Sequence, residues 1–283
     1  MTPEEQYKIN QKFLDASKKN ELELVVELLG RGADIEAKNK GGQTALMLSS
    51  ESGDADVALM LVEKGADLET KDANGYTALM CAIVLGHADV ALVLMEKSAN
   101  LEAKNKHGRT ALMWASGSGR ADVALALLEK GADLEAKDKE GRTGLMWSAH
   151  RGYIDVAIAF IDKGADLEVK DNDGYTALML ASFRGHAAVE LTLIAHGADS
   201  GKLPSENSFH GFTPLQACTA GGFLPKLQAS LKSPEPRRLA CEQPQALMDI
   251  ALEYNQPDAA GVIQSHLAMC AIDGLLAMEI PNE

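Results

Sequence analysis

Along the chain, short apolar runs that predict helices alternate with polar connectors. The run "TALMCAIVL" (residues 77–85) is almost wholly apolar, and "ADVALVLMEK" (residues 88–97) carries apolar residues at helical spacing. We expect the buried side of the second run to be formed by Val90, Leu92, Val93 and Leu94. The connector "NLEAKNKHGR" has Asn and Gly at turn positions, which predicts a hairpin-like loop. One unit is therefore a helix, a short turn, a second helix and an extended connector.

The ends of the predicted helices carry their own signals. Thr77 is suited to cap the first helix, because its hydroxyl can accept an N–H that has no partner within the helix. Gly86 is suited to end it in a left-handed conformation. Near the start of the chain, "TPEE" from Thr2 to Glu5 predicts a capping box with proline at the first helical position.

This unit is repeated with a constant period of 33 residues. The threonine before each first helix recurs at Thr44, Thr77, Thr110, Thr143 and Thr176. Glycine follows each first helix at Gly53, Gly86, Gly119, Gly152 and Gly185. One such unit cannot bury its own apolar surface, so the core must form between stacked neighbours. The repeat predicts an elongated solenoid.

The repeated marks resemble those of the ankyrin repeat. Its pattern D-x-x-G-x-T-P-L-H-x-A is matched by "DANGYTALMCA" (residues 72–82), "DKEGRTGLMWS" (138–148) and "DNDGYTALMLA" (171–181). The resemblance implies an all-α solenoid of about seven to eight helix-turn-helix units, joined by β-hairpin-like loops, with capping helices at both ends. The chain departs from the family where Met replaces His, at Met47, Met80, Met113, Met146 and Met179. These methionines predict flexible apolar packing between repeats.

The repeat pattern predicts a single domain over residues 1–283. Residues 1–43 form an N-terminal cap repeat, and residues 44–199 form five regular repeats followed by a loop to residue 212. Residues 213–283 form degenerate C-terminal repeats, one of which begins near Gln245, and a closing cap.

Charge and composition narrow the classes of partner and compartment. The chain has 27 basic and 41 acidic residues, a net charge of −14, which disfavours nucleic acid and anionic membrane surfaces. The four cysteines are scattered and fit buried free thiols in a reducing compartment. No apolar leader and no membrane-length apolar run is present. We expect a cytoplasmic monomer. The alternative is a protein translocated into a host cell without a Sec signal, as ankyrin proteins of intracellular bacteria are.

No motif in the sequence predicts catalysis, a cofactor or a metal. The phosphate-binding loop, the nucleophile elbow and the H-E-x-x-H zinc motif are all missing. Carboxylates recur once per repeat, at Glu36, Glu69, Glu102, Glu135 and Glu168, so they are expected to serve the solenoid. His87 and His186 are likewise expected to be structural. We expect a non-enzymatic protein. The alternative is an enzymatic activity within residues 200–283, where Cys218 and His266 lie.

The resemblance implies that a partner docks on the concave face, made by the connector tips and the first helices. Positions in these columns vary between repeats, whereas the framework positions hardly vary. The variable positions collect aromatic and basic side chains: Tyr76, Arg109, Trp114, Arg142, Trp147, His150, Arg151, Tyr175, Phe183, Arg184 and Phe212. Trp, Tyr and Arg dominate binding hot spots, and arginine binds carboxylates through two parallel hydrogen bonds. We therefore expect a protein partner with acidic and apolar groups.

Two interpretations of this cluster remain open. The tryptophans after "TALM" either contact a partner or lean into the core between repeats, and the arginines either bind or only balance an acidic chain. Stacked repeats lie roughly 10 Å apart, so Arg109, Trp114, Arg142 and Trp147 are expected to form one patch. The predicted function is an adaptor, scaffold or inhibitor, with a translocated bacterial effector as the alternative.

Overall fold

The computed structural model describes residues 1–203, 213–221, 227–228, 231 and 244–265. The described residues form fourteen labelled α-helices, one 3-10 helix and a further helical segment at residues 257–265, with no strand, which confirms the predicted all-α class. None of the helices described is long and apolar enough to span a bilayer. Contacts divide the chain into two compact units. Unit 1 is residues 1–166 with 170–174, and unit 2 is residues 167–169 with 175–283. The single-domain organisation remains a prediction.

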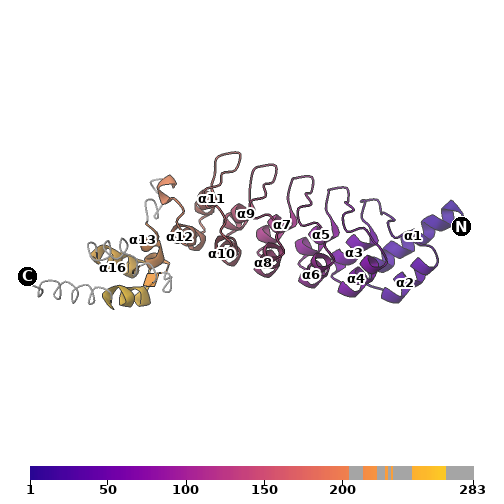
Figure 1. The fold of residues 1–283 in the computed structure, drawn as a ribbon, viewed down its shortest axis with the longest axis horizontal. Coiled ribbons are helices and arrows are strands. Elements are labelled where there is room, and N and C mark those ends of the chain that lie inside the picture. Colours follow the sequence, from indigo (N-terminus) through magenta and orange to yellow (C-terminus); the bar gives the residue numbers. More distant parts are fainter. Residues whose placement is uncertain (204–212, 222–226, 229–230, 232–243, 266–283) are drawn as a thin grey trace, which may run out of the picture. The chain divides into compact units, whose positions relative to one another are not determined.

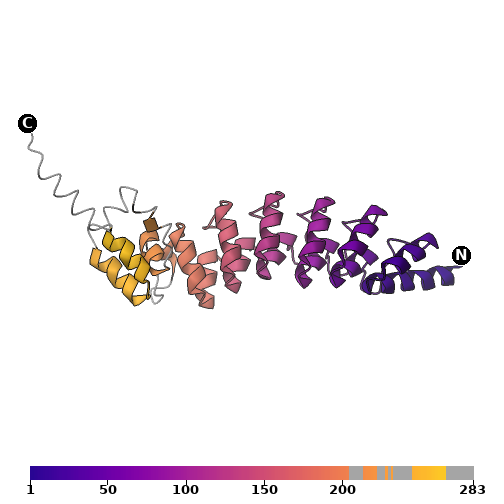
Figure 2. The same ribbon diagram turned by 90° about the horizontal axis from the view of Figure 1, so that it is seen from below.

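Unit 1 contains five helix pairs, which stand side by side in Figure 1. The first helices are α1 (Pro3–Lys18), α3 (Ala45–Ser52), α5 (Ala78–Leu85), α7 (Ala111–Gly117) and α9 (Gly144–Arg151). The second helices are α2 (Leu22–Gly30), α4 (Ala55–Glu63), α6 (Ala88–Glu96), α8 (Ala121–Glu129) and α10 (Ile154–Asp162). First helices pack on first helices and second helices on second helices, so that the repeats build two layers (Figure 2). Stacking supplies the core that no single repeat can bury.

The helix-end signals are confirmed. In each regular repeat the threonine hydroxyl accepts the backbone N–H three residues later, as Thr77 does from Met80. Gly86 ends α5 with φ of 88°, in the left-handed region that glycine enters without strain. Thr2 and Glu5 form the predicted capping box, with Pro3 opening α1.

Burial of the second helices follows the helical period, and one predicted core residue is wrong. In α6 the buried residues are Val90, Ala91, Leu94 and Met95, whereas Leu92 is exposed. Residues are separated by about 100° around a helix, so position 92 lies on the side opposite position 90. Val93 is half-buried at the boundary between the two faces.

The methionine column lies where apolar packing was predicted. Met47, Met80, Met113 and Met146 are each no more than 2 % exposed in the layer of first helices. Met179, in unit 2, is half-buried.

The recurring carboxylates and lysines join neighbouring repeats of unit 1. The Glu69 carboxylate accepts the backbone N–H of Asn100 (2.8 Å), 31 residues later, and equivalent bonds recur at each repeat boundary. Lys71 Nζ donates to the carbonyl of Lys104 (2.8 Å), and Lys104 Nζ to that of Lys137 (2.9 Å). The structural role expected of the carboxylates is therefore confirmed. His87 Nε2 contacts the Glu51 carbonyl (2.9 Å), which confirms a structural role for this histidine as well.

Unit 2 continues the helical pattern. It contains α11 (Ala177–Arg184), α12 (Ala187–Ala195), η1 (Ser200–Lys202), α13 (Pro214–Ala220) and α16 (Pro244–Glu253), and residues 257–265 are also helical. Thr213 caps α13 in a capping box with Gln216, which extends the repeat signal to the predicted position. The expanded loop up to residue 212, the Pro-containing loop and the closing cap fall outside the described residues.

Candidate functional site

Each tip loop of unit 1 is shaped by one Asn or Asp side chain. In loop 104–109, Asn105 Oδ1 accepts the backbone N–H of His107 (2.9 Å) and of Arg109 (3.0 Å). One repeat later, Asp138 Oδ1 accepts those of Glu140 (3.0 Å) and Arg142 (2.9 Å). These bonds close the turn and leave the second polar atom of each side chain pointing inward. The hairpin turn expected for the "DNDGY"-type sequences is therefore present in these loops.

The structure brings Arg109, Trp114, Arg142 and Trp147 together, as predicted. The guanidinium carbons of Arg109 and Arg142 lie 4.1 Å and 4.3 Å from the Trp147 ring centroid, within cation–π range. Arg109 also lies 5.2 Å from the ring of Trp114. Trp147 is only 8 % exposed and packs with Met113 and Ala136. The alternative that a tryptophan leans into the core is thus correct for Trp147.

Asp138 organises the Trp147 side of this cluster. Its Oδ2 accepts a hydrogen bond from Trp147 Nε1 (3.0 Å), and it lies 3.5 Å from Arg142 Nε and 3.8 Å from Arg109 Nε. The Asp138 side chain is fully buried. Arg142 also donates to Glu140 (3.0 Å), and this hydrogen bond lowers the pKa of the Glu140 carboxyl. The two arginines therefore face two carboxylates of the chain itself, and Arg142 is already paired.

The Trp114 side has the same frame but lacks the carboxylate. Trp114 Nε1 and Asn105 Nδ2 are both buried; Nε1 finds no acceptor among the described residues, whereas the Asn105 side chain interacts with the Tyr76 hydroxyl. The Tyr76 ring lies 5.4 Å from the Trp114 ring. Burial raises the pKa of Tyr76, while a hydrogen bond with the Asn105 side chain and the Arg109 charge act in the opposite direction. Asn105 and Asp138 were not predicted as site residues because they occupy a framework column. The sequence signal that could have identified them is the change from Asn105, before Trp114, to Asp138 at the equivalent position before Trp147.

Further side chains of unit 1 extend this surface along the ends of the first helices. Val84 and Leu85 at the end of α5 are exposed, Leu85 to 53 %. The His150 ring meets Trp147 edge-on (6.3 Å between centroids), and Arg151 is exposed at the end of α9. We call these tip loops and first-helix ends of unit 1 the tip-helix face. Val84 and Leu85 belong to the variable columns, although only aromatic and basic side chains were predicted as contacts.

The remaining predicted residues are not brought into this cluster. Tyr175, Phe183 and Arg184 belong to unit 2, where Phe183 is 74 % exposed and Arg184 lies 5.6 Å from its ring. Phe212 falls outside the described residues. Their contribution to partner binding stays a prediction.

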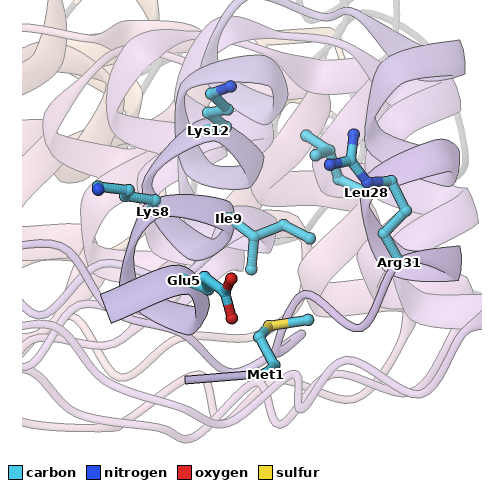
Figure 3. Close-up of a pocket in the computed structure, with 7 residues that line it drawn as sticks. All are labelled: Met1, Glu5, Lys8, Ile9, Lys12, Leu28 and Arg31. Atoms are coloured by element: carbon cyan, nitrogen blue, oxygen red, sulfur yellow. The ribbon is translucent and has the colours of Figure 1, made fainter. Parts of the chain in front are cut away.

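A separate pocket of about 490 Å³ lies at the start of unit 1, between α1 and α2 (Figure 3). It is lined by Met1, Glu5, Lys8, Ile9, Lys12, Leu28 and Arg31. Several of its charged groups are engaged locally, since Lys8 pairs with Glu4 (2.6 Å) and Arg31 with Glu27 (3.1 Å). None of the predicted site residues lies here.

The described residues contain no group of three or more His, Cys, Asp or Glu side chains suited to hold a metal ion. Cys81 is a buried free thiol, and burial raises its pKa. A thiol with a raised pKa is a poor nucleophile. The side chains of Cys218, Cys241, Cys270 and His266 are outside the part of the chain that the structure describes.

The chain matches the model of a known protein family. A family model described as "Ankyrin repeats (3 copies)" matches residues 13–105, 93–138 and 132–204. No curated protein matches the chain.

Proposed function

Because the chain belongs to the ankyrin-repeat family, whose repeats are generally protein–protein interaction modules, we propose that it is a non-enzymatic binding protein. It binds a protein partner on the tip-helix face of unit 1, as a monomer, and acts as an adaptor, scaffold or inhibitor. The partner presents acidic and apolar groups.

The observation that carries this proposal is an exposed apolar and basic surface on an acidic chain. Val84 and Leu85 are exposed on α5. The following tip loop, residues 104–109, holds Lys104, Lys106, His107 and Arg109 and no acidic residue, although the chain carries a net charge of −14. Adjacent exposed apolar side chains beside polar residues are typical of contact surfaces, whereas apolar residues exposed singly are ordinary on a monomer. A basic loop beside them favours an acidic partner.

The rigidity of the face supports the same proposal. Successive tip loops are joined by backbone hydrogen bonds, from Ala73 to Gly41 (2.9 Å), Lys106 to Asn74 (3.0 Å) and Lys139 to His107 (3.1 Å). A surface that is ordered before binding loses little conformational freedom on association. The negative charge elsewhere on the chain opposes binding to nucleic acid phosphates.

The test replaces exposed residues of the face and measures binding. Trp147 is unsuitable, because removing a buried ring would test the fold instead. We would introduce Leu85→Glu with Arg151→Glu, both at exposed positions, and use the variant as bait for partners captured by the wild-type chain. We expect captured partners to be lost or weakened at least about tenfold, a change of about 1.4 kcal/mol.

The matched control is Leu125→Glu, which makes the same substitution at an exposed leucine of α8, in the layer of second helices. It should bind like the wild-type chain. Equal loss in both variants, or no loss in Leu85→Glu with Arg151→Glu, would contradict the proposed face.

A further inference from the structure

The tip loops at 104–109 and 137–142 frame two versions of one site. In the later repeat, Trp147 Nε1 is satisfied by the Asp138 carboxylate at 3.0 Å. In the earlier repeat, Asn105 takes the place of Asp138, and Trp114 takes that of Trp147, 33 residues apart in both cases. The amide orientation of Asn105 is set by its two bonds to backbone N–H groups, so its Nδ2 donor points inward. Trp114 Nε1 then lies buried with no acceptor among the described residues, and the partner of the Asn105 side chain is the Tyr76 hydroxyl.

Buried donors without acceptors are rare in folded proteins, and those that occur need an explanation. Asn105 is 5 % exposed and is therefore well sheltered from solvent. The Arg109 guanidinium borders the site, and its Nε lies 3.8 Å from Asp138 Oδ2, farther than Arg142 Nε at 3.5 Å. The earlier site thus combines two neutral donors and a cation, and its own loop, residues 104–109, supplies no anion; the Asp72 carboxylate acts on Tyr76 from the preceding loop.

We propose that this site, formed by Asn105, Trp114, Arg109 and Tyr76, receives the carboxylate of an Asp or Glu side chain from the protein partner. The proposal rests on the proposed function and assigns the chemistry recognised at one point of the tip-helix face. The neighbouring repeat shows that a carboxylate fits such a frame, because Asp138 occupies it there.

The charges of the two loops favour an external anion only at the earlier repeat. Loop 137–142 supplies Asp138 and Glu140 against its cations, whereas loop 104–109 has no carboxylate. Lys106 and His107 are exposed at its tip and add positive charge at the approach to the site. The basic loop 104–109 attracts an acidic side chain of the partner, whereas Asp138 already takes the equivalent place at loop 137–142.

Entry requires the side chains over the donors to move. Tyr76 is half-buried with its ring against Trp114, and Arg109 is 21 % exposed above the same ring. Displacement of Tyr76 exposes Trp114 Nε1 and Asn105 Nδ2 to the incoming carboxylate, while Arg109 contributes a charge-assisted hydrogen bond. Apolar groups next to that carboxylate in the partner would cover Val84 and Leu85.

The experiment fills the site with a carboxylate of the chain itself. Phage-displayed random peptides are selected on the full-length protein, and those that lose binding to Leu85→Glu with Arg151→Glu are titrated by calorimetry. Asn105→Asp is expected to weaken these peptides at least about tenfold. Replacing the Asp or Glu on which a peptide's binding depends by Asn or Gln should weaken its binding to the wild type by the same factor. The Asn105→Asp variant should bind the amide peptide no more weakly than it binds the acidic peptide, because both changes remove the same interaction.

Asn74→Asp is the matched control, because it adds the same charge at an exposed position in the preceding tip loop. It should weaken binding no more than about twofold at physiological salt, where surface charges are screened. Equal effects of Asn74→Asp and Asn105→Asp, or selected peptides without acidic residues, overturn the carboxylate site and leave the proposed function standing. A selection in which no peptide depends on Leu85 and Arg151 overturns the proposed function itself.

Discussion

Two adjacent repeats of unit 1 have equivalent tip loops and tryptophans, but only one of the two indole nitrogens has an acceptor. The repeat around Trp147 has a buried carboxylate, Asp138, that accepts from the indole and faces two arginines. The repeat around Trp114 has an amide, Asn105, in that place, and the Trp114 Nε1 has no acceptor in the described structure. The backbone of the two loops is the same, since each Oδ1 closes its turn through two N–H groups.

The difference teaches that a framework residue can serve two purposes at once. One oxygen of the Asn or Asp shapes the loop, and the other atom decides whether the indole nitrogen of the tryptophan next to it has a carboxylate acceptor. Exchanging nitrogen for oxygen at this single atom converts a donor into a charged acceptor without changing the size of the side chain. The following predictions test this comparison.

Asp138→Asn has the largest expected effect. It leaves Trp147 Nε1 facing a donor and removes the counter-charge of Arg109 and Arg142, as breaking a buried pair does. We expect a loss of about 3 kcal/mol in the free energy of unfolding, measured by urea denaturation. An unchanged denaturation midpoint would show that Asp138 is not what stabilises this repeat.

Gly144→Ala is expected to cost about 1–3 kcal/mol through overpacking. Gly144 replaces the alanine found at Ala111 in the preceding repeat, and a β-carbon there would lie 2.8 Å from Cε1 of the buried Phe160 ring. Phe160 in turn replaces Leu127 of the preceding repeat.

The double variant Gly144→Ala with Phe160→Leu should recover part of that stability, because it restores the pair found one repeat earlier. Thermal unfolding of the two single variants and the double variant gives the coupling energy. Additive effects would mean that the two positions are independent.

Asn105→Asp should stabilise the chain, by about 1 kcal/mol for the hydrogen bond it adds. The new carboxylate accepts from Trp114 Nε1 and faces Arg109, in the way that Asp138 does one repeat later. The midpoint of thermal unfolding should rise by about 2–4 °C. A lower midpoint would indicate that the burial of the charge outweighs the new bonds.

Glu140→Gln has the smallest expected effect. Glu140 is half exposed, so its pair with Arg142 is screened and worth no more than about 0.5 kcal/mol. The hydrogen bond from Arg142 lowers its pKa in the folded chain. The contribution is therefore present above the ordinary Glu pKa of about 4.3 and is lost as the pH falls through the folded value. Denaturation at neutral pH and near pH 3 should show a small difference that disappears in acid.

Much of unit 1 could be predicted from the sequence because its signals are local. Threonine caps, glycine ends and the apolar first helices each depend on residues within one or two turns of helix, and their period of 33 residues implies stacking. Leu92 was placed wrongly because the buried stripe of a short second helix is narrower than its run of apolar residues. The proximity of Arg109 to Trp147 was predictable because stacking places equivalent positions side by side.

The chain's repeat period by itself determined the family, the all-α architecture and the columns in which a binding face would lie. The tertiary structure decided which of those side chains are available, because burial and pairing depend on contacts between repeats. It buried Trp147 between two arginines and paired Arg142 with the chain's own carboxylates. It also left Trp114 with a buried indole N–H that has no acceptor in the described structure. The two tryptophans share one sequence context, and only the atom facing each indole nitrogen distinguishes them.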